Sequence, residues 1–464
     1  MPLIKSISGI RGTIGGKTGE TLSPVDVVKF TAAYGTILKK NASSTKAVKV
    51  VIGRDGRISG AMVSQLVQST LSSLGIDVVD LGLSTTPTVE IAVPMEKADG
   101  GIILTASHNP KEWNALKLLN EKGEFISAET GQELLNIAAA EDFSFVSVDK
   151  LGKISTNTSY MQKHIDAIIA YPLVNKEAIA AKQFKVVVDA INSTGATFVP
   201  ALLNALGVEN ITVLNKEITG NFAHNPEPLP DHLAELSNTV VKEKADLGIA
   251  VDPDVDRLCF VCEDGSMFGE EYTLVAVADY ILSQRKGNTV SNMSSTKALK
   301  EITLKRGGGY FPSAVGEVNV VKKMKEHDAV IGGEGNGGII VPDFHYGRDA
   351  LIGIALFLTH LSQQKTKSTK SLRSLYPDYF ISKNKIELDS SVDVKHIFKN
   401  IKKKYAKNPI NDEDGLKIEF DADWVHLRTS NTEPIIRIYS ESDFESKANH
   451  IAQKLMADIK EEIK

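Results

Sequence analysis

The sequence predicts an α/β protein with mostly parallel sheets and more than one domain. Short β-branched runs alternate with longer helical patterns along most of the chain, which is typical of β-α-β units. The chain has 464 residues, and about 150 residues per domain would give about three domains. Hydrophobic residues make up 42% and charged residues 24%, which excludes a disordered chain, a collagen-like repeat and a membrane bundle.

The expected strands are apolar runs that each end in a polar or glycine-rich loop: 48–52, 101–104, 185–188, 247–251 and 329–331. Helical patterns lie between them at 24–39, 62–74, 158–169, 198–206 and 272–282. Ligands of open α/β sheets bind beyond the carboxyl ends of strands. The loops that follow the strands are therefore where we expect the function.

Three segments suggest boundaries within the chain. Residues 143–156 look like a linker strand, and a second break falls near Asp252. The Lys/Ser/Thr-rich segment Gln363–Lys370 has no periodicity and is interpreted as a connector. From about Ile381 onward, strands mix with helices, which predicts a small α+β domain at the C-terminus.

Charge and composition limit the partners and the compartment. With 53 Lys+Arg and 58 Asp+Glu, the net charge is −5, so no basic excess exists to hold a nucleic-acid backbone. The apolar stretch 350–361 is too short to span a membrane and predicts a buried helix. The N-terminus carries no apolar signal segment, and the two cysteines, Cys259 and Cys262, suit buried hydrophobes rather than disulfides. We therefore expect a cytoplasmic protein with no nucleic-acid or membrane partner.

The first candidate loop is Thr105–Pro110, directly after the expected strand 101–104. A serine at a strand end can be exposed as a nucleophile, which makes Ser107 a candidate. Its neighbour His108 is poorly placed to act as its general base. The alternative is a Ser/Thr turn that caps the next segment.

The second loop carries Asp252, Asp254 and Asp256 after the strand 247–251. Three carboxylates so close together repel one another unless a cation neutralises them, and hard oxygen ligands suit Mg²⁺. An EF-hand is excluded because Arg257 stands where that loop needs glycine. A phosphatase with a D-x-D-x-V motif and a solvated acidic turn remain as alternatives.

Two more loops complete the candidate site. Residues 332–338 hold five glycines around Glu334 and Asn336, polar groups that can hydrogen-bond sugar hydroxyls, although a glycine-rich turn without a ligand is the alternative. The segment 428–434, with Arg437 next, gathers guanidinium, hydroxyl and amide groups that suit a phosphate. Its alternative is a surface turn with a charge pair. The motif Gly53–Arg57 is a weaker signal.

A phosphorylated sugar that exchanges its phosphoryl group with Ser107 would use all four loops. A phosphoserine carries about −1.5 to −2 charges at pH 7. The acidic loop cannot face that charge unless a divalent ion lies between them. A bridging Mg²⁺ would also draw charge from the transferring phosphoryl group.

The ordered set TASHNP, DPDVDR, GGEGNGG and RTSNTEP, with GIRG and GRDGR before it, resembles the α-D-phosphohexomutase superfamily across essentially the whole chain. The resemblance implies three related α/β domains with mixed sheets and a C-terminal α+β domain around a central cleft. The boundaries expected on this basis are 1–152, 153–252, 253–368 and 369–464.

The resemblance also implies roles for individual residues. Ser107 would be the phosphoserine, with Arg11, Lys117 and His108 as catalytic groups beside it. Mg²⁺ would be held by Ser107, Asp252, Asp254 and Asp256. Substrate would be bound by Arg257, Glu334, Asn336, Arg428, Ser430, Asn431, Thr432 and Arg437.

Some positions depart from the family pattern. Ala115 and Val255 stand where glycine is common, Asn336 where serine is usual, Gly338 where histidine often stands, and Asn431 where glycine is frequent. The GEGNGG form resembles members assigned to phosphoglucosamine, while phosphoglucose and phosphomannose stay open as substrates.

The expected reaction interconverts a hexose 6-phosphate and a hexose 1-phosphate through phospho-Ser107 and a hexose 1,6-bisphosphate. Gln363–Lys370 is the candidate hinge for the domain motion that lets the bisphosphate turn over, and we expect a monomer or a homodimer. Two competing hypotheses are a phosphatase with Asp252 as nucleophile and a sugar-phosphate sensor without catalysis.

Overall fold

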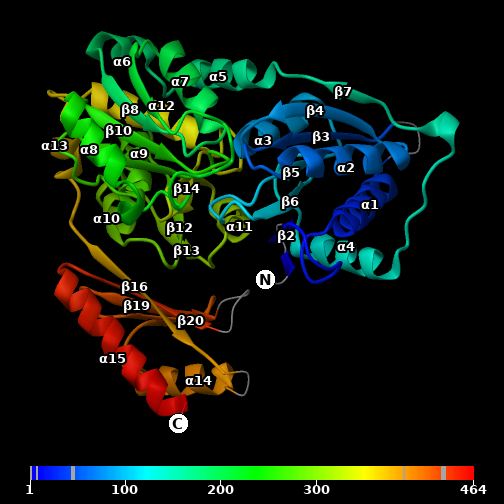
Figure 1. Ribbon diagram of the computed structural model, residues 1–464. Helices are drawn as coiled ribbons and strands as arrows, with labels where there is room; N and C mark the ends of the chain where they lie inside the picture. Colours follow the sequence, from blue (N-terminus) through cyan, green and yellow to red (C-terminus); the bar gives the residue numbers. More distant parts are fainter. Residues whose placement is uncertain (1–2, 7–8, 43–46, 390–391, 430–434, 464) are drawn as a thin grey trace.

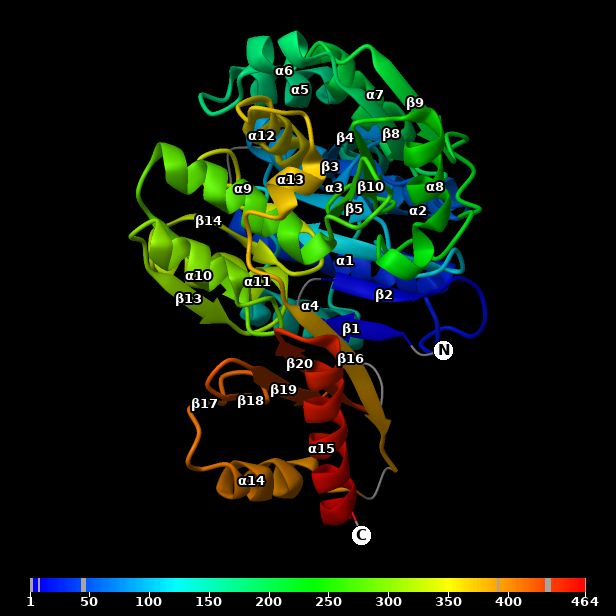
Figure 2. The same cartoon turned by 90° about the vertical axis from the view of Figure 1, so that its left-hand side faces the viewer.

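The computed structural model describes residues 3–6, 9–42, 47–389, 392–429 and 435–463. Four sheets define four successive structural units, and the fourth unit lies apart from the other three in both ribbon views (Figures 1 and 2). The first unit contains the strands β1 (Ile4–Ser6), β2 (Gly9–Thr13), β3 (Lys49–Arg54), β4 (Asp77–Leu83), β5 (Gly100–Leu104), β6 (Trp113–Leu119) and β7 (Ile154–Thr156). Its helices are α1 (Pro24–Asn41), α2 (Gly60–Ser73), α3 (Thr86–Met95) and α4 (Ala128–Ala140).

The second unit contains β8 (Lys185–Asp189), β9 (Asn210–Leu214), β10 (Leu247–Val251), β11 (Leu258–Cys262), α5 (Tyr160–Ala170), α6 (Lys176–Lys182), α7 (Gly195–Ala205) and α8 (Ala234–Glu243). The third contains β12 (Asn288–Asn292), β13 (Tyr310–Ser313), β14 (Ala329–Glu334), β15 (Gly338–Ile340), α9 (Glu270–Gln284), α10 (Ala298–Lys305), α11 (Glu317–Glu326), α12 (Ala350–Ser362) and α13 (Thr369–Arg373). The fourth contains β16 (Phe380–Glu387), β17 (Ile410–Asn411), β18 (Leu416–Glu419), β19 (Trp424–Thr429), β20 (Ile435–Ser442), α14 (Val394–Lys404) and α15 (Glu445–Ile463).

The first three units repeat one strand order. In the sheets β6-β5-β3-β4, β11-β10-β8-β9 and β15-β14-β12-β13, the last three strands are parallel and the first is antiparallel to its neighbour. The first unit extends this sheet with β2, β1 and β7. The fourth sheet, β16-β20-β19-β18-β17, is antiparallel throughout. The predicted fold class, three related α/β units with mixed sheets and a C-terminal α+β unit, is confirmed.

The second and third units share a hydrophobic core. The helix α12, every residue of which is buried, contacts α5, α6 and α7 of the second unit as well as α9 of the third. The expectation of a buried helix at 350–361 is therefore confirmed. Cys259 and Cys262 are unpaired and buried on opposite faces of β11. No helix among the described residues is long and apolar enough to cross a membrane.

Two segments differ from the expectation. In 143–156 only Ile154–Thr156 forms a strand, and it extends the first sheet by pairing with β4. The segment Gln363–Lys370 is tied down at its end, because Ser368 Oγ and Lys370 N both bind the Glu263 carboxylate and α13 begins at Thr369. Sequence showed no periodicity there because the anchoring contacts are polar and come from a distant part of the chain.

The chain crosses into the fourth unit a few residues later. Tyr272 Oη donates to Pro377 O at 2.7 Å and accepts from Tyr379 N at 2.8 Å. The guanidinium of Arg373 lies 3.3 Å from the centre of the Tyr272 ring. This crossing at 377–380 leads directly into β16 and, like the end of Gln363–Lys370, is held by hydrogen bonds to the preceding part of the chain.

A buried network of polar side chains, centred on Asp349, joins the first three units; we call it the Asp349 node. Asp349 caps α12 by accepting from Leu351 N at 2.8 Å, and its other oxygen lies 2.9 Å from His164 Nε2 and 3.2 Å from His345 Nε2. His164 Nδ1 contacts Thr88 Oγ1 on α3 at 2.9 Å. Burial opposes ionisation of Asp349, but the two histidines outweigh it and hold the pKa of Asp349 below its usual value.

We expect Asp349→Asn to lower the free energy of unfolding by about 3 kcal/mol, because a buried charge network loses its anion. Because folding depresses the pKa of Asp349, the difference from wild type should be full at neutral pH and should shrink as the pH falls below about 4. Denaturant unfolding at several pH values measures both effects. The control is Asp343→Asn, which removes an exposed partner of Arg285 and should cost less than about 1 kcal/mol. Equal midpoints for the two variants would contradict the role of this node.

Candidate active site

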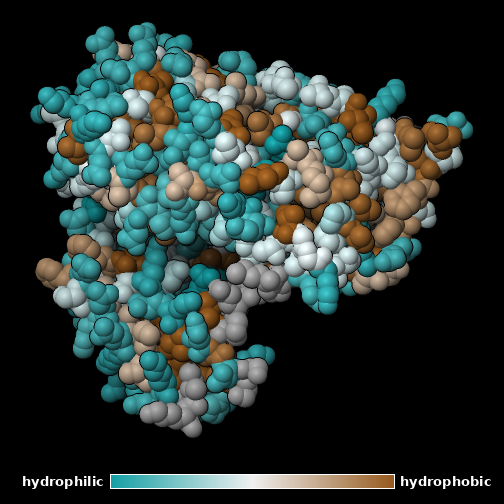
Figure 3. All heavy atoms as spheres, viewed as in Figure 1, coloured by the Kyte–Doolittle hydropathy of each residue, from teal (hydrophilic) through white to brown (hydrophobic). Residues whose placement is uncertain are grey.

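Three of the four candidate loops occupy the same topological position. Each connects the last parallel strand of its unit to the antiparallel strand: 105–112 from β5 to β6, 252–257 from β10 to β11, and 335–337 from β14 to β15. Residues from all three line one cleft of about 520 Å³. Figure 3 shows the molecule hollowed between the fourth unit and the other three.

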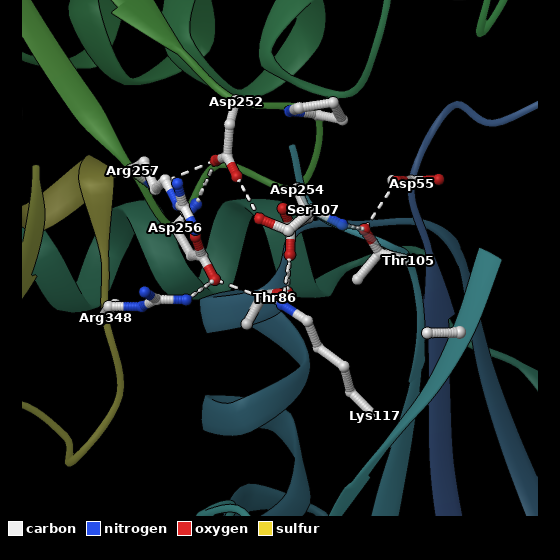
Figure 4. A network of polar contacts seen from close by, with 12 residues as sticks. Asp55, Thr86, Thr105, Ser107, Lys117, Asp252, Asp254, Asp256, Arg257 and Arg348 are labelled. Atoms are coloured by element: carbon white, nitrogen blue, oxygen red, sulfur yellow. Dashed lines mark hydrogen bonds and ion pairs between the residues drawn. The ribbon is translucent and has the colours of Figure 1, made fainter. Parts of the chain in front are cut away.

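The backbone of the first loop holds Ser107 in an unusual conformation. Ser107 has φ +49°, in the left-handed region that most residues avoid. Its N–H donates to Thr105 Oγ1 at 2.9 Å, and the Thr105 hydroxyl donates to Asp55 Oδ2 at 2.7 Å. The turn directs the Ser107 hydroxyl across to the second unit, where it donates to Asp252 Oδ2 at 2.7 Å (Figure 4).

Arg57 fixes this loop from behind. Its side chain is buried and donates to the carbonyls of Ser107, Asn109, Pro110 and Trp113. Its Nε contacts Asp55 Oδ2 at 3.0 Å, so the charge is balanced where it is buried. The loop that carries Ser107 is therefore wrapped around a guanidinium, whose planar donors match several carbonyls at once.

The loop between β10 and β11 carries three carboxylates, and one oxygen from each lies close to an oxygen of the other two. Asp252 Oδ1 accepts from the N–H groups of Asp256 and Arg257 at 3.1 and 3.0 Å. Asp254 Oδ2 accepts from Thr86 Oγ1 at 2.6 Å and Lys117 Nζ at 2.7 Å, while Asp254 Oδ1 has no hydrogen-bond partner among the described residues. The loop also holds Val255 at φ +61°, which explains why this position favours glycine.

Asp256 follows the same arrangement. Its Oδ2 accepts from Arg348 Nη2 at 2.7 Å and Lys117 Nζ at 3.3 Å, and its buried Oδ1 has no hydrogen-bond partner within the described part of the chain. Ligand oxygens of Asp252, Asp254 and Asp256 lie within 4.8 Å of one another. Buried carboxylate oxygens without donors are costly, so this set of hard oxygens fits a divalent cation such as Mg²⁺.

The pKa shifts of Asp252 and Asp256 show which carboxylate is most affected by the repulsion within the trio. Burial, followed by the charges of Asp254 and Asp256, raises the pKa of Asp252 well above its usual value. Burial also opposes ionisation of Asp256, but Arg348 and Lys117 outweigh it and lower its pKa. Repulsion among the three carboxylates therefore disfavours the charged form of Asp252, the carboxylate that faces Ser107.

The structure brings most of the expected residues to this cleft. Its lining includes Arg11, Ser107, His108, Lys117, Arg257, Glu334 and Asn336. His108 Nδ1 lies 3.4 Å from Ser107 Oγ, and Arg11 donates to Asn109 Oδ1 at 2.8 Å. Arg257 pairs with Glu227 at 2.7 Å. Burial, followed by the charges of Arg257 and Arg11, lowers the pKa of His108 well below its usual value, so its ring is neutral.

The phosphate residues of the fourth unit are only partly described. Ser430, Asn431 and Thr432 lie outside the described residues. Arg428 and Arg437 face each other across the β19–β20 ladder, and Arg428 Nε lies 3.2 Å from Asp414 Oδ2. Directly opposed residues of a sheet share a face, so the two arginines lie on one face of the fourth sheet. Neither is among the described residues that line the cleft.

Sequence reasoning missed three residues that shape the site: Thr86, Glu317 and Arg348. Asp55 and Arg57 were noted only as part of a weak motif, and Thr105 only as the start of the first candidate loop. Several of their contacts join distant parts of the chain, such as the one between Thr86 and Asp254. The one available signal was GRDGR, whose adjacent opposite charges suit a buried pair.

The fold and the site together define a four-unit α/β protein whose strand-end loops form one cleft for an anion and a cation. Four family models match consecutive parts of the chain: phosphoglucomutase/phosphomannomutase alpha/beta/alpha domain I at residues 4–145, domain II at 162–265, domain III at 269–379, and the C-terminal domain at 387–458. The chain belongs to this phosphoglucomutase/phosphomannomutase family of the α-D-phosphohexomutase superfamily.

Individual relatives match over nearly the whole length. A phosphoglucomutase/phosphomannomutase of Thermococcus kodakarensis is 35% identical, covering 98% of this chain and 99% of the relative. A phosphoglucosamine/phosphogalactosamine mutase of Sulfurisphaera tokodaii is 32% identical, covering 96% and 97%. The crystal structure of a phosphoglucomutase/phosphomannomutase family protein from Burkholderia thailandensis shares the fold, with 24% identity, a TM-score of 0.85, and coverage of 99% and 98%.

We expect Arg57→Lys to lower the rate of phosphoryl transfer at Ser107 by about a hundredfold, because an ammonium cannot hold the same carbonyls and the serine moves. The matched control is Arg54→Lys, since Arg54 ends β3 three residues before Arg57 and its guanidinium donates to Asp55 O rather than to the serine loop. Steady-state kinetics of both variants, with thermal melts to confirm folding, measure the effect. If Arg57→Lys and Arg54→Lys lose rate equally, the positioning role is wrong.

Proposed function

We propose that this chain is a phosphohexomutase that interconverts a hexosamine 6-phosphate and the corresponding 1-phosphate, through phospho-Ser107 and a hexosamine 1,6-bisphosphate. The observation that carries the proposal is the 2.7 Å contact between Ser107 Oγ and Asp252, within a trio of carboxylates that has free oxygens. Relatives named phosphoglucosamine mutase support the choice of sugar. Phosphomannomutase/phosphoglucomutase activity is the alternative, because a relative with 35% identity carries that name.

Each half-reaction moves one phosphoryl group. The bond from phosphorus to Ser107 Oγ breaks, a bond to the sugar hydroxyl oxygen forms, and the proton of that hydroxyl leaves. Ser107 Oγ takes up a proton as its bond to phosphorus breaks, so the transfer balances when the proton of the sugar hydroxyl is passed on to that oxygen. We assign this relay to His108, whose Nδ1 lies 3.4 Å from Ser107 Oγ. The return transfer uses the other phosphate of the bisphosphate and reverses these changes at Ser107.

The surrounding cations have distinct tasks. Lys117 is held by Asp254 and Asp256, and these acids outweigh burial and raise its pKa, so it stays charged beside the transferring group. Ser107, Asp252, Asp254 and Asp256 would hold Mg²⁺, which withdraws charge from the phosphoryl group. Arg11 would neutralise charge beside the seryl phosphate, and Arg257 would bind substrate in the cleft. Arg428 and Arg437, with Ser430, Asn431 and Thr432, would bind the phosphate that is not transferred.

Other expectations stay predictions at this stage. The expected domain limits, 1–152, 153–252, 253–368 and 369–464, stay a prediction. By sheet pairing, β7 (Ile154–Thr156) goes with the first unit and β11 (Leu258–Cys262) with the second, and α13 is hydrogen-bonded to Glu263. A monomeric or homodimeric state and a cytoplasmic setting also stay proposed. Two unpaired, buried cysteines support a reducing compartment.

The decisive experiment compares wild type with Ser107→Ala on glucosamine, glucose and mannose 1-phosphates, with bisphosphate supplied. We expect interconversion by wild type, with the highest kcat/KM for glucosamine, and a loss of at least about a thousandfold in Ser107→Ala, because the covalent acceptor is gone. Phosphopeptide mass spectrometry should place the phosphoryl label on Ser107. A label on Asp252, or hydrolysis in place of isomerisation, would favour the phosphatase instead.

We expect metal removal with EDTA to abolish activity and Mg²⁺ to restore it. Asp254→Asn should raise the Mg²⁺ concentration for half-maximal activity by about ten- to a hundredfold, because one ligand charge is lost. Calorimetric titration of Mg²⁺ checks the same change without catalysis. Asp264→Asn is the control, since Asp264 follows β11 at the surface and pairs with Lys370. An unchanged Mg²⁺ requirement in Asp254→Asn would count against the site.

A further inference from the structure

The cleft combines cationic and anionic parts. The first unit contributes Lys5, Arg11 and His108 to its lining, and the acidic hairpin contributes Arg257. The third unit contributes Glu317 and Glu334, together with Asn319, Asn336 and Arg348. A substrate that fits both parts carries phosphate for the cations and a donor, or a positive charge, for the carboxylates.

Glu334 has little capacity left for a substrate. Its Oε1 accepts from Asn292 Nδ2 at 2.9 Å and from Gly316 N at 3.0 Å. Its Oε2 accepts from Arg348 Nη1 at 2.7 Å and from Asn336 Nδ2 at 3.5 Å. The carboxylate that the motif suggested for sugar recognition is thus engaged by the protein on both oxygens.

Glu317 differs, because one of its oxygens has no donor. Its Oε1 accepts from Arg348 N at 3.1 Å. Its Oε2 lies 3.1 Å from Arg348 Nε without the alignment of a hydrogen bond, and no other described donor reaches it. Glu317 is 8% exposed and lines the cleft at the start of α11. An unpaired buried carboxylate oxygen is costly unless a ligand supplies the donor.

The positive charge beside this carboxylate is shared with other acids. One guanidinium, that of Arg348, is shared among Asp256, Glu317 and Glu334. Glu90 lies behind, 2% exposed, with neither oxygen hydrogen-bonded to a described group. Burial, and then the charge of Glu317, raises the pKa of Glu90 well above its usual value. Burial raises the pKa of Glu317 as well, against the charge of Arg348, so a ligand that brings a positive charge would stabilise the ionised form of Glu317.

We propose that Glu317 is the specificity-determining residue for an amino sugar, and that its Oε2 accepts from the ammonium group of a hexosamine phosphate. This inference rests on the proposed mutase function and names the feature of the substrate that the cleft selects. An ammonium supplies both a donor and a positive charge where the cleft has an excess of carboxylates. A hydroxyl supplies only the donor, and an N-acetyl group supplies a neutral, bulkier amide. The favoured substrate is therefore the free amine.

The experiment measures kcat and KM of wild type, Glu317→Gln and the control Glu326→Gln with glucosamine, N-acetylglucosamine and glucose 1-phosphates at saturating Mg²⁺. We expect Glu317→Gln to lower kcat/KM for glucosamine 1-phosphate by about ten- to a hundredfold, mostly through KM, because a charge-assisted hydrogen bond is lost. For glucose 1-phosphate the same variant should change by less than about threefold, since a neutral amide still accepts from a hydroxyl. Glu326→Gln makes the same change at the exposed far end of α11, away from the cleft lining, and should leave the ranking of substrates unchanged.

A binding measurement separates specificity from chemistry. In the Ser107→Ala background, which cannot turn over substrate, Glu317→Gln should weaken the binding of glucosamine 6-phosphate. The binding affinity for glucose 6-phosphate, measured by the same calorimetry, should stay unchanged. Equal losses for both sugars, or no loss for either, would overturn the role of Glu317 while leaving the mutase intact, as would a wild-type preference for glucose. Absence of interconversion of every sugar phosphate by folded wild type would instead overturn the proposed function, and this inference with it. Thermal melts establish that each variant is folded.

Discussion

The constraint on which the site depends is the burial of Asp252, Asp254 and Asp256 in one hairpin loop beside Ser107. Like charges so close together in a buried site must be relieved, and the protein does so unequally. Backbone N–H groups hold Asp252, Lys117 and Thr86 hold Asp254, and cations hold Asp256. Asp254 and Asp256 are thereby each left with one oxygen that has no described donor, while the second oxygen of Asp252 accepts from Ser107. A loop that would otherwise be an electrostatic defect becomes a preformed set of ligands.

Repetition of one strand order explains how distant segments meet. In each of the first three units, the functional loop connects the last parallel strand to the antiparallel strand that follows it. When three such units pack around one point, their equivalent loops converge, and each supplies a different group: a serine, an acidic trio and a glycine-rich loop. The shared core around α12 joins the second and third units, and the contacts from Asp349 through His164 to Thr88 connect them to the first. The fourth unit, which carries the paired arginines Arg428 and Arg437, is attached through the short crossing at 377–380.

Arg348 connects the two halves of the cleft chemically. Its guanidinium contacts Asp256 in the acidic loop and Glu334 beside the glycine-rich loop, both at 2.7 Å. A shift of either loop therefore disturbs the other. Because Arg348 also pairs with Asp256 and Glu334, its positive charge only partly offsets the charge of Glu317. Asp256 and Glu317 each keep one oxygen without a described hydrogen-bond donor, because one positive charge is divided among three carboxylates.

The sequence by itself determined the fold class, the strand-end loops and the identity of Ser107 and the acidic trio, because strand periodicity and residue chemistry are local properties. It predicted the buried helix at 350–361 for the same reason. Only the tertiary structure decided that Arg57 wraps the serine loop, that Arg348 bridges two loops, and that Gln363–Lys370 is anchored at its end by Glu263. These contacts join residues that are far apart along the chain, and their geometry depends on how whole units pack. No local pattern records which oxygen of Glu317 is left without a donor.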